Sequence, residues 1–269
     1  MSFKQNLHTH TTFCDGKNTP EEMVERAIEL GFDAIGFSGH SYREGSKFSM
    51  SVEGTEEYKK EIARLKEKYS NQIEVYLGIE LEMLSETNLS GYDYIIGAKH
   101  YFNINGQHVG FDRSAGEVKA VIDEYFGGDG LKFAKKYYEE LYELTKYNID
   151  IVAHFDLITK NCEKQMLFDI ESKEYRRYAL DSLSALVEKI KIFEVNTGAM
   201  ARGYRTSPYP MPFILKELKN LGGKVTISSD CHDKNYLNYY FDESIQLVKS
   251  CGFDKLTVLS KGEFKEIKI

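Results

Sequence analysis

Short apolar runs along the chain alternate with longer segments in which apolar residues recur at helical spacing. Apolar runs of about four to eight residues are typical of buried strands, whereas a repeat every three or four residues is typical of amphipathic helices. These runs predict strands over residues 34–38, 73–79, 92–98, 149–153, 192–195 and 224–229, and the alternating segment 6–11 is expected to be a further strand. The helical repeats between them predict helices over residues 20–30, 55–69, 130–144, 173–190, 210–221 and 235–251.

The first two predicted helices carry end signals. Thr19, Pro20 and Glu22 have the spacing of a capping box with proline at the first helical position, and Gly31 follows the last apolar position of that helix. Thr55 is the expected cap of the second helix, because a threonine hydroxyl can accept a hydrogen bond from a free amide of the first turn.

Two stretches do not fit this alternation. Residues 101–129 are rich in glycine and charge and have no clean period, so we expect an excursion at one rim of the fold with a short helix near residues 115–126. The last apolar segments, residues 256–259 and 264–269, are expected to be terminal trim. The sequence contains no linker, low-complexity tract or change of composition, which predicts a single domain over residues 1–269.

Histidine or carboxylate residues follow six of the seven predicted strands. Alternating strands and helices indicate parallel pairing, in a barrel or in a doubly wound sheet. The strand ends of an open sheet lie along a line, whereas those of a barrel surround one mouth, where barrel enzymes keep their chemistry. We therefore predict an α/β barrel, with His108 as an ordinary exposed residue. The residues at the strand ends are His8, His10, His40, Glu80, His100, His154, Asp230 and His232.

Composition narrows the classes of partner. The formal charge is −7 and no block of lysine or arginine is present, which disfavours a nucleic acid as the main partner. The N-terminal residues lack the apolar core of a signal peptide, and no apolar run reaches the ~18 residues of a membrane span. The four cysteines are widely spaced, as expected of reduced thiols. We expect a cytoplasmic, soluble protein without a membrane partner.

The histidine positions predict a metal site. In a strand, alternate side chains share one face, so His8 and His10 point to the same side. Six imidazoles and the three carboxylates Asp15, Glu80 and Asp230 are more donors than one ion can bind, so we expect two or three ions. Clustered divalent cations attract a phosphate dianion and activate water. These residues therefore favour a metal-dependent hydrolase, and within that class a phosphoesterase.

The motifs of the chain resemble those of the polymerase and histidinol phosphatase (PHP) superfamily, in order and over nearly the whole length. The match is closer to its histidinol-phosphate phosphatase branch, through the segments 99–101, 154–158, 194–198 and 209–210. The resemblance implies a distorted TIM-like barrel of seven β/α units, a trinuclear metal centre, and hydrolysis of L-histidinol phosphate in histidine biosynthesis. The superfamily motifs are His8-Thr9-His10, Asp15-Gly16, His40, Gly78-Ile79-Glu80, His100, His154 and Asp230-Cys231-His232.

The resemblance also implies a distribution of the ligands over three divalent ions, with zinc, manganese and iron left open. Glu80 bridges two of the ions, and Asp230, Glu80 and His232 are expected to act in catalysis. Either Asp230 or a metal-bound water is expected to protonate the leaving alkoxide, and no covalent phosphoenzyme is needed. One ion takes His8, His10, Glu80 and Asp230, a second takes Glu80, His100 and His154, and the third takes Asp15, His40 and His232.

Substrate-binding residues are expected on the loops around the same mouth. Arg202 and Arg205 follow the sixth strand, and a guanidinium can bind phosphate through two hydrogen bonds. Lys99 is a further candidate for phosphate, although its alternation with His100 can turn it away from the metals. Glu117 is a candidate for the amine and imidazole of the substrate. Other acidic candidates for that subsite are Asp112, Asp156 and Glu163.

Two alternatives stay open. One is another PHP phosphoesterase, a nucleotidase or a nuclease, for which a basic groove and stacking aromatic residues are expected. The other is a non-catalytic scaffold in which the ions only hold the barrel closed. Structural metal sites have no free coordination position, whereas catalytic sites keep one for water. The oligomeric state is left open.

Overall fold

The structure is a computed structural model that describes residues 3–269. Over these residues, seven parallel strands form one sheet in the order β1–β2–β3–β4–β7–β8–β9. This order follows the chain, so each strand lies beside the preceding one, as in a barrel. The strands are β1 (Gln5–Asn6), β2 (Ala34–Phe37), β3 (Glu74–Glu82), β4 (Tyr94–Ala98), β7 (Ile151–Val152), β8 (Ile192–Asn196) and β9 (Lys224–Ser228).

The sheet closes between its first and last strands. Just beyond β1 and β9, Thr9 and Cys231 form a parallel bridge. The amide of His10 donates to the carbonyl of Cys231 at 2.8 Å, and the amide of Cys231 donates to the carbonyl of His8 at 3.0 Å. The predicted distorted barrel of seven β/α units is confirmed, because the sheet is nearly closed at the end of the strands that carries the histidines.

Regular pairing of β1 is shorter than the predicted strand over residues 6–11. The side chain of Asn6 accepts a hydrogen bond from the amide of His8 at 3.0 Å and donates to the hydroxyl of Ser229 at 2.7 Å. A side chain that bonds to nearby backbone competes with the ladder of a sheet. Pairing of β1 with β2 therefore stops at Asn6.

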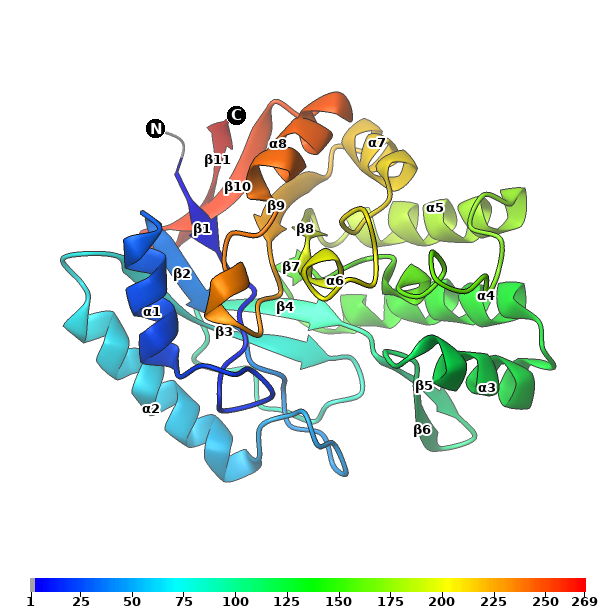
Figure 1. The fold of residues 1–269 in the computed structure, drawn as a ribbon, viewed down its shortest axis with the longest axis horizontal. Coiled ribbons are helices and arrows are strands. Elements are labelled where there is room, and N and C mark those ends of the chain that lie inside the picture. The colour runs from blue at the N-terminus through cyan, green and yellow to red at the C-terminus, as the bar shows by residue number, and fades with distance from the viewer. Residues whose placement is uncertain (1–2) are drawn as a thin grey trace.

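Helices cover the outside of the barrel (Figure 1). α1 (Pro20–Glu29) begins with the predicted capping box, in which Thr19 and Glu22 each bond to the backbone of the other. In the described part of the chain, none of the helices is long and apolar enough to cross a membrane. The other helices are α4 (Gly130–Leu141), α5 (Lys173–Val187), α6 (Gly198–Ala201), α7 (Pro212–Asn220) and α8 (Phe241–Ser250), with 3₁₀ turns η1 (Tyr142–Lys146), η2 (Leu157–Thr159) and η3 (Lys234–Tyr236).

Two predicted helix starts are wrong. α2 (Val52–Lys68) is capped by Ser51, whose hydroxyl accepts from the amide of Gly54 at 2.9 Å, and Thr55 lies inside the helix. Because glycine has a low helix propensity, Gly54 makes the first turn of this helix difficult to recognise in the sequence. The last helix, predicted from residue 235, begins at Phe241, because the backbone of Tyr240 has a positive φ of 61° that interrupts a right-handed helix.

The excursion over residues 101–129 has more regular structure than its sequence pattern predicts. β5 (Tyr101–Ile104) and β6 (Gln107–Gly110) form an antiparallel hairpin, and the predicted short helix is α3 (Ala115–Phe126). Asn105 and Gly106 form the turn with φ of 52° and 81°, and this residue pair is a strong hairpin signal that the helical and strand periods do not capture. His108 is exposed on β6.

The C-terminal segment is not trim but a separate two-stranded sheet that packs against the barrel. β10 (Lys255–Ser260) and β11 (Glu263–Lys268) form an antiparallel hairpin beside β1, and β10 packs on β9 (Figure 1). The side chain of Gln5 accepts from the amide of Leu259 at 2.9 Å and donates to the carbonyl of Thr257 and the hydroxyl of Thr226 at 3.4 and 3.3 Å. One buried side chain therefore joins β1, β9 and β10.

The barrel interior below the strand ends is filled by the ring of Tyr94. Its hydroxyl donates to the carbonyls of Leu7 and Phe37. A Cβ atom at Gly78 would lie 2.2 Å from this ring, and one at Gly36 would lie 2.4 Å from its hydroxyl oxygen. The two strand glycines are required by this close approach, and the tyrosine closes the floor under the mouth of the barrel.

Candidate metal centre

The strand ends bring all nine predicted ligands together at one mouth of the barrel. Three sets of ligand atoms each lie within 4.8 Å of one another in the described structure. We call them the His8 cluster, the His154 cluster and the His40 cluster. The His8 cluster is His8, His10 and Asp230; the His154 cluster is Glu80, His100 and His154; the His40 cluster is His10, Asp15, His40 and His232.

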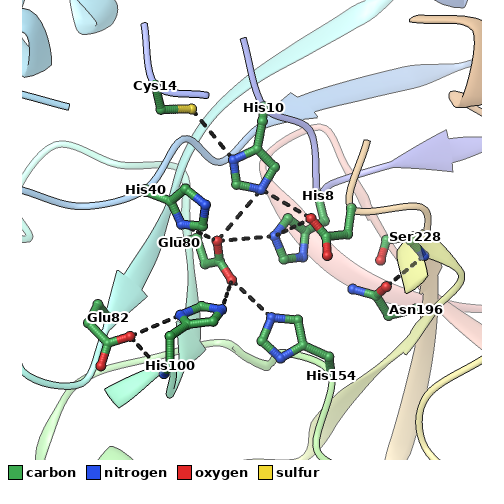
Figure 2. A network of polar contacts seen from close by, with 12 residues as sticks. His8, His10, Cys14, His40, Glu80, Glu82, His100, His154, Asn196 and Ser228 are labelled. Atoms are coloured by element: carbon green, nitrogen blue, oxygen red, sulfur yellow. Dashed lines mark hydrogen bonds and ion pairs between the residues drawn. The ribbon is translucent and has the colours of Figure 1, made fainter. Parts of the chain in front are cut away.

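Glu80 lies at the centre of the three clusters. Strand alternation turns Tyr76, Gly78 and Glu80 of β3 toward the barrel interior. The Glu80 carboxylate is almost fully buried and faces five imidazoles, as Figure 2 shows. Its oxygens lie 2.7 Å from His40 Nδ1, 3.1 Å from His154 Nε2, 3.4 Å from His8 Nε2, 3.6 Å from His10 Nε2 and 3.6 Å from His100 Nε2.

The other two carboxylates, Asp15 and Asp230, both lie beside His10 and His232. Asp230 follows β9 with a positive φ of 45°, and its Oδ1 lies 3.2 Å from His10 Nε2. A non-glycine residue in this conformation is uncommon and is found at functional sites. Asp15 lies 3.3 Å from His232 Nε2 and 3.6 Å from His40 Nε2.

The protonation states of Glu80 and His10 suit metal binding. Burial alone would raise the pKa of Glu80, but His40, His8 and His100 hold it well below its usual range. Burial, together with His232 and His40, lowers the pKa of His10 to about 3. Ionised carboxylates and a neutral imidazole are the forms that bind a metal ion.

Several ligand atoms make no hydrogen bond although they are buried. Within residues 3–269, His8 Nε2, His10 Nε2 and Asp15 Oδ1 have no partner in hydrogen-bond geometry. Buried polar atoms in native proteins are nearly always satisfied, so these three point to a bound ion. The mixed nitrogen and oxygen donors fit a divalent transition metal.

Glu82 is a site residue that the sequence analysis missed. Its carboxylate accepts hydrogen bonds from the amide and from Nδ1 of His100, both at 2.9 Å, which turns Nε2 of His100 toward Glu80 (Figure 2). The signal was present in the sequence, because Glu82 is two residues after Glu80 and shares its face of β3.

A cavity of about 580 Å³ opens above the clusters, and two predicted substrate-binding residues line it. Arg202 donates to the carbonyl and the carboxylate of Asp230 at 2.9 and 3.0 Å. Glu117 forms the capping box of α3 with the N-cap residue Ser114, and its carboxylate lies 3.5 Å from the guanidinium of Arg113.

The other two predicted substrate-binding residues, Arg205 and Lys99, are not among the described residues that line the cavity. Arg205 is buried, stacks on Tyr209 and donates to Thr159 and Ser207. The amine of Lys99 turns away from His100 and donates to Glu140 at 2.7 Å. In both cases a neighbouring element supplies the partner, which local sequence does not indicate.

The cavity also contains basic residues that the sequence analysis did not single out. Arg43 stacks 3.8 Å above the ring of Tyr101, and Lys160 pairs with Asp112 at 2.5 Å. Of the other acidic candidates, Asp156 and Glu163 fall outside the described lining, whereas Asp112 belongs to it. These residues come from loops without a period, so only the tertiary structure shows that they share a cavity.

Known proteins resemble this chain over most of its length. The PHP domain family model matches residues 6–198. A probable histidinol-phosphatase of Schizosaccharomyces pombe is 26% identical, over 95% of this chain and 89% of the relative. A histidinol-phosphatase of Bacillus subtilis is 24% identical, over 90% of this chain and 98% of the relative.

A solved structure is similar over nearly all of both chains. It is a histidinol phosphate phosphatase from Lactococcus lactis in complex with zinc, L-histidinol and phosphate. The TM-score is 0.74 and the identity is 22%, over 97% of this chain and 98% of the other. At this identity the likeness shows the fold, a barrel with its mouth at the strand ends.

Proposed function

Since this chain belongs to the PHP domain family, we propose that it is a metal-dependent phosphomonoesterase that hydrolyses L-histidinol phosphate to L-histidinol and phosphate in histidine biosynthesis. The observation that carries the proposal is the set of six imidazoles and three carboxylates beneath one cavity. The relatives named histidinol-phosphatase, which match over nearly their whole length, support this substrate. We propose that residues 1–269 form one PHP-type barrel domain.

We also propose that the three clusters hold three divalent ions, of zinc, manganese or iron. The unpartnered buried atoms of His8, His10 and Asp15 support this assignment. When bound, such ions supply Lewis acidity at the phosphoryl oxygens and lower the pKa of a water molecule. The Glu80 carboxylate, between the imidazoles of all three clusters, orients the ligands.

The residues around the ions have separate proposed tasks. Arg202 lines the cavity and binds the phosphate, as the guanidinium fork allows. The ionised Asp230 accepts the proton of the attacking water and then returns it to the leaving alkoxide, as the new P–O bond forms and the ester P–O bond breaks. His232, whose Nδ1 lies 3.0 Å from the carbonyl of Asp230, holds that residue in place. Glu117 at the rim binds the substrate amine.

The cavity size is consistent with a small substrate. A volume of about 580 Å³ falls in the range of small-molecule pockets, which is about 300–1,000 Å³. Arg43, Lys160 and Arg202 place basic groups among the carboxylates of its lining, although the chain carries a net charge of −7. This combination favours a compact phosphate ester over a nucleic acid.

The test is phosphate release by protein reconstituted with zinc, manganese or iron(II). L-Histidinol phosphate is compared with a dinucleotide and a 3′-nucleotide, and His8→Ala is the control. We expect a preference for L-histidinol phosphate, and at least about 100-fold lower activity in the variant, because a lost metal removes several kcal/mol of transition-state stabilisation. Preference for the nucleotides would assign the site to another PHP activity, and no hydrolysis would indicate a scaffold.

A further inference from the structure

Glu194, in the middle of β8, is buried beneath the metal centre and is only 1% exposed. Its carboxylate belongs to none of the three clusters of the described structure. It instead accepts hydrogen bonds from four donors on four strand ends. These are His8 Nδ1 at 2.6 Å, the amide of His154 at 2.9 Å, Asn196 Nδ2 at 2.8 Å and the hydroxyl of Ser228.

Two of these donors belong to different clusters. His8 is a member of the His8 cluster, and His154 is a member of the His154 cluster. The other two, Asn196 and Ser228, hold the carboxylate itself and lie beside His8 in Figure 2. Glu194 is therefore a fixed acceptor that contacts the supports of two clusters at once.

The bond to His8 determines which ring nitrogen can bind a metal. When Nδ1–H donates to a carboxylate, the proton is fixed on Nδ1 and the lone pair of Nε2 is free. His8 Nε2 is buried, has no partner in hydrogen-bond geometry within the described chain, and lies 3.4 Å from Glu80. The Glu194 carboxylate thus aims the ring of His8 at the centre.

The bond to His154 acts on the backbone. β7 has only two paired residues, Ile151 and Val152, so its ladder fixes the following segment weakly. The amide of His154 donates to the side chain of Glu194 in β8 instead of to a backbone carbonyl of a neighbouring strand. This bond sets the position from which the His154 ring reaches Glu80 at 3.1 Å.

Glu82 holds one predicted metal ligand in a similar way. Its carboxylate accepts from both the amide and Nδ1 of His100, which is a member of the His154 cluster. Glu82 and Glu194 therefore provide a comparison within one protein. One carboxylate holds a ligand of a single cluster, and the other holds ligands of two.

We infer that Glu194 is a positioning residue that couples the His8 and His154 clusters, so that both lose metal affinity together when its carboxylate is removed. The inference rests on the proposed function, and it goes beyond it by assigning a role to a residue that belongs to none of the three clusters. A carboxylate behind a metal-binding histidine is worth about 10–100-fold in metal affinity.

The test is stepwise zinc binding in competition with a chelator. Glu194→Gln keeps the shape of the side chain and removes its charge. The zinc equivalents are assigned with His8→Ala, His154→Ala and His232→Ala, each of which removes one ligand of a different cluster. Asp150→Asn is the matched control, because Asp150 also accepts a strand amide, that of Ile95 at 2.8 Å, at the opposite end of β4 from His100.

In Glu194→Gln we expect about 10–100-fold weaker zinc binding at the His8 and His154 clusters, with the His40 cluster unchanged. Glu82→Gln is expected to weaken the His154 cluster alone, and Asp150→Asn to weaken none. In zinc-free protein, at a pH high enough for the His8 imidazole to be neutral, ¹⁵N spectra are expected to show the Nδ1–H form of His8, and a lower population of it in Glu194→Gln.

The inference would be overturned if Glu194→Gln kept the zinc affinity and the His8 tautomer of the wild type. An equal loss of zinc affinity at all three clusters would also overturn it, because that result indicates a general structural role. If Glu194→Gln does not fold, Ser228→Ala, which removes one bond to the same carboxylate, is expected to give a smaller loss at the same two clusters. An unaffected Ser228→Ala protein would then overturn the inference. Neither readout uses substrate, so the result is independent of the ester that the enzyme hydrolyses.

Discussion

Arg202 and Arg205 stand three residues apart in the chain, but their surroundings differ. The guanidinium of Arg202 lines the cavity and bonds to Asp230, whereas that of Arg205 bonds to Ser207 and Thr159 and stacks on Tyr209 away from the cavity lining. Arg202 is thus available to substrate, and Arg205 joins buried segments.

Exchanging each arginine for glutamine is expected to separate these roles. Arg202→Gln should raise KM about 10–100-fold, because a hydrogen bond from a charged donor contributes about 1.5–3 kcal/mol. Arg205→Gln should leave KM unchanged and lower the free energy of unfolding by about 1–3 kcal/mol, because it leaves buried acceptors unpaired. Steady-state kinetics and urea unfolding measure the two effects. A raised KM in Arg205→Gln would instead indicate that Arg205 binds the phosphate.

The histidines of the centre predict how metal binding depends on pH. Burial alone would lower the pKa values of His8, His40 and His100, but the neighbouring carboxylates raise all three. Below these raised values the metal-free imidazoles are protonated, so a metal ion must displace protons to bind. Zinc affinity should therefore fall as the pH falls, starting above the ordinary histidine value of about 6.5.

Zinc competition titrations between pH 8.5 and 5.5 measure this dependence. Each displaced proton contributes about a tenfold change in apparent Kd per pH unit. Zinc binding that does not change until the pH falls below the ordinary histidine value would contradict the prediction.

At the level of the elements, a buried glutamine helps to join the C-terminal hairpin to the barrel. Gln5 bonds to Thr226 of β9 and to Thr257 and Leu259 of β10. Gln5→Leu leaves the amide of Leu259 and the carbonyl of Thr257 without these partners. We expect a loss of about 1–3 kcal/mol in the free energy of unfolding, because unpaired buried groups carry their full desolvation cost.

Urea unfolding of Gln5→Leu tests this docking, with the exposed Gln72→Leu as the control. The control should unfold like the wild type, and both variants should bind zinc normally, since Gln5 lies at the end of β1 away from the ligands. Equal stability of Gln5→Leu and the wild type would show that the hairpin is held by other contacts.

For the whole molecule, the ions are expected to stabilise the barrel. The ligands come from β1, β2, β3, β4, β7 and β9 and from the loop that carries Asp15, so bound metal links most of the sheet. An ion at a hundred times its Kd adds about 2.7 kcal/mol. A chelator should therefore lower Tm by roughly 5–10 °C for each ion removed, at about 2–4 °C per kcal/mol.

Calorimetry with and without chelator, followed by re-addition of zinc, measures the shift. His232→Ala, which lacks a ligand of the His40 cluster, should show a smaller loss of Tm on chelation. An unchanged Tm after verified removal of the metal would mean that the ions do not contribute to closure of the barrel.

The sequence by itself determined the barrel and the composition of its mouth. Strand and helix periods are local, and the alternation of side chains placed His8, His10, Glu80 and His154 at strand ends before any contact was known. The same rule could have found Glu82. The Asn105-Gly106 turn could also have been predicted from the sequence, because a hairpin turn depends on only two residues.

Only the tertiary structure decided which residues beyond the ligands take part in the centre. Arg43 and Lys160 have no period or motif chemistry of their own, and the bond of Glu194 to His8 joins residues far apart in the sequence. The turn of Lys99 toward Glu140 and the burial of Arg205 depend likewise on segments from elsewhere in the chain. The physical reason is that direction and pairing of a side chain are set by neighbours in space, whereas its face on a strand is set by the chain alone.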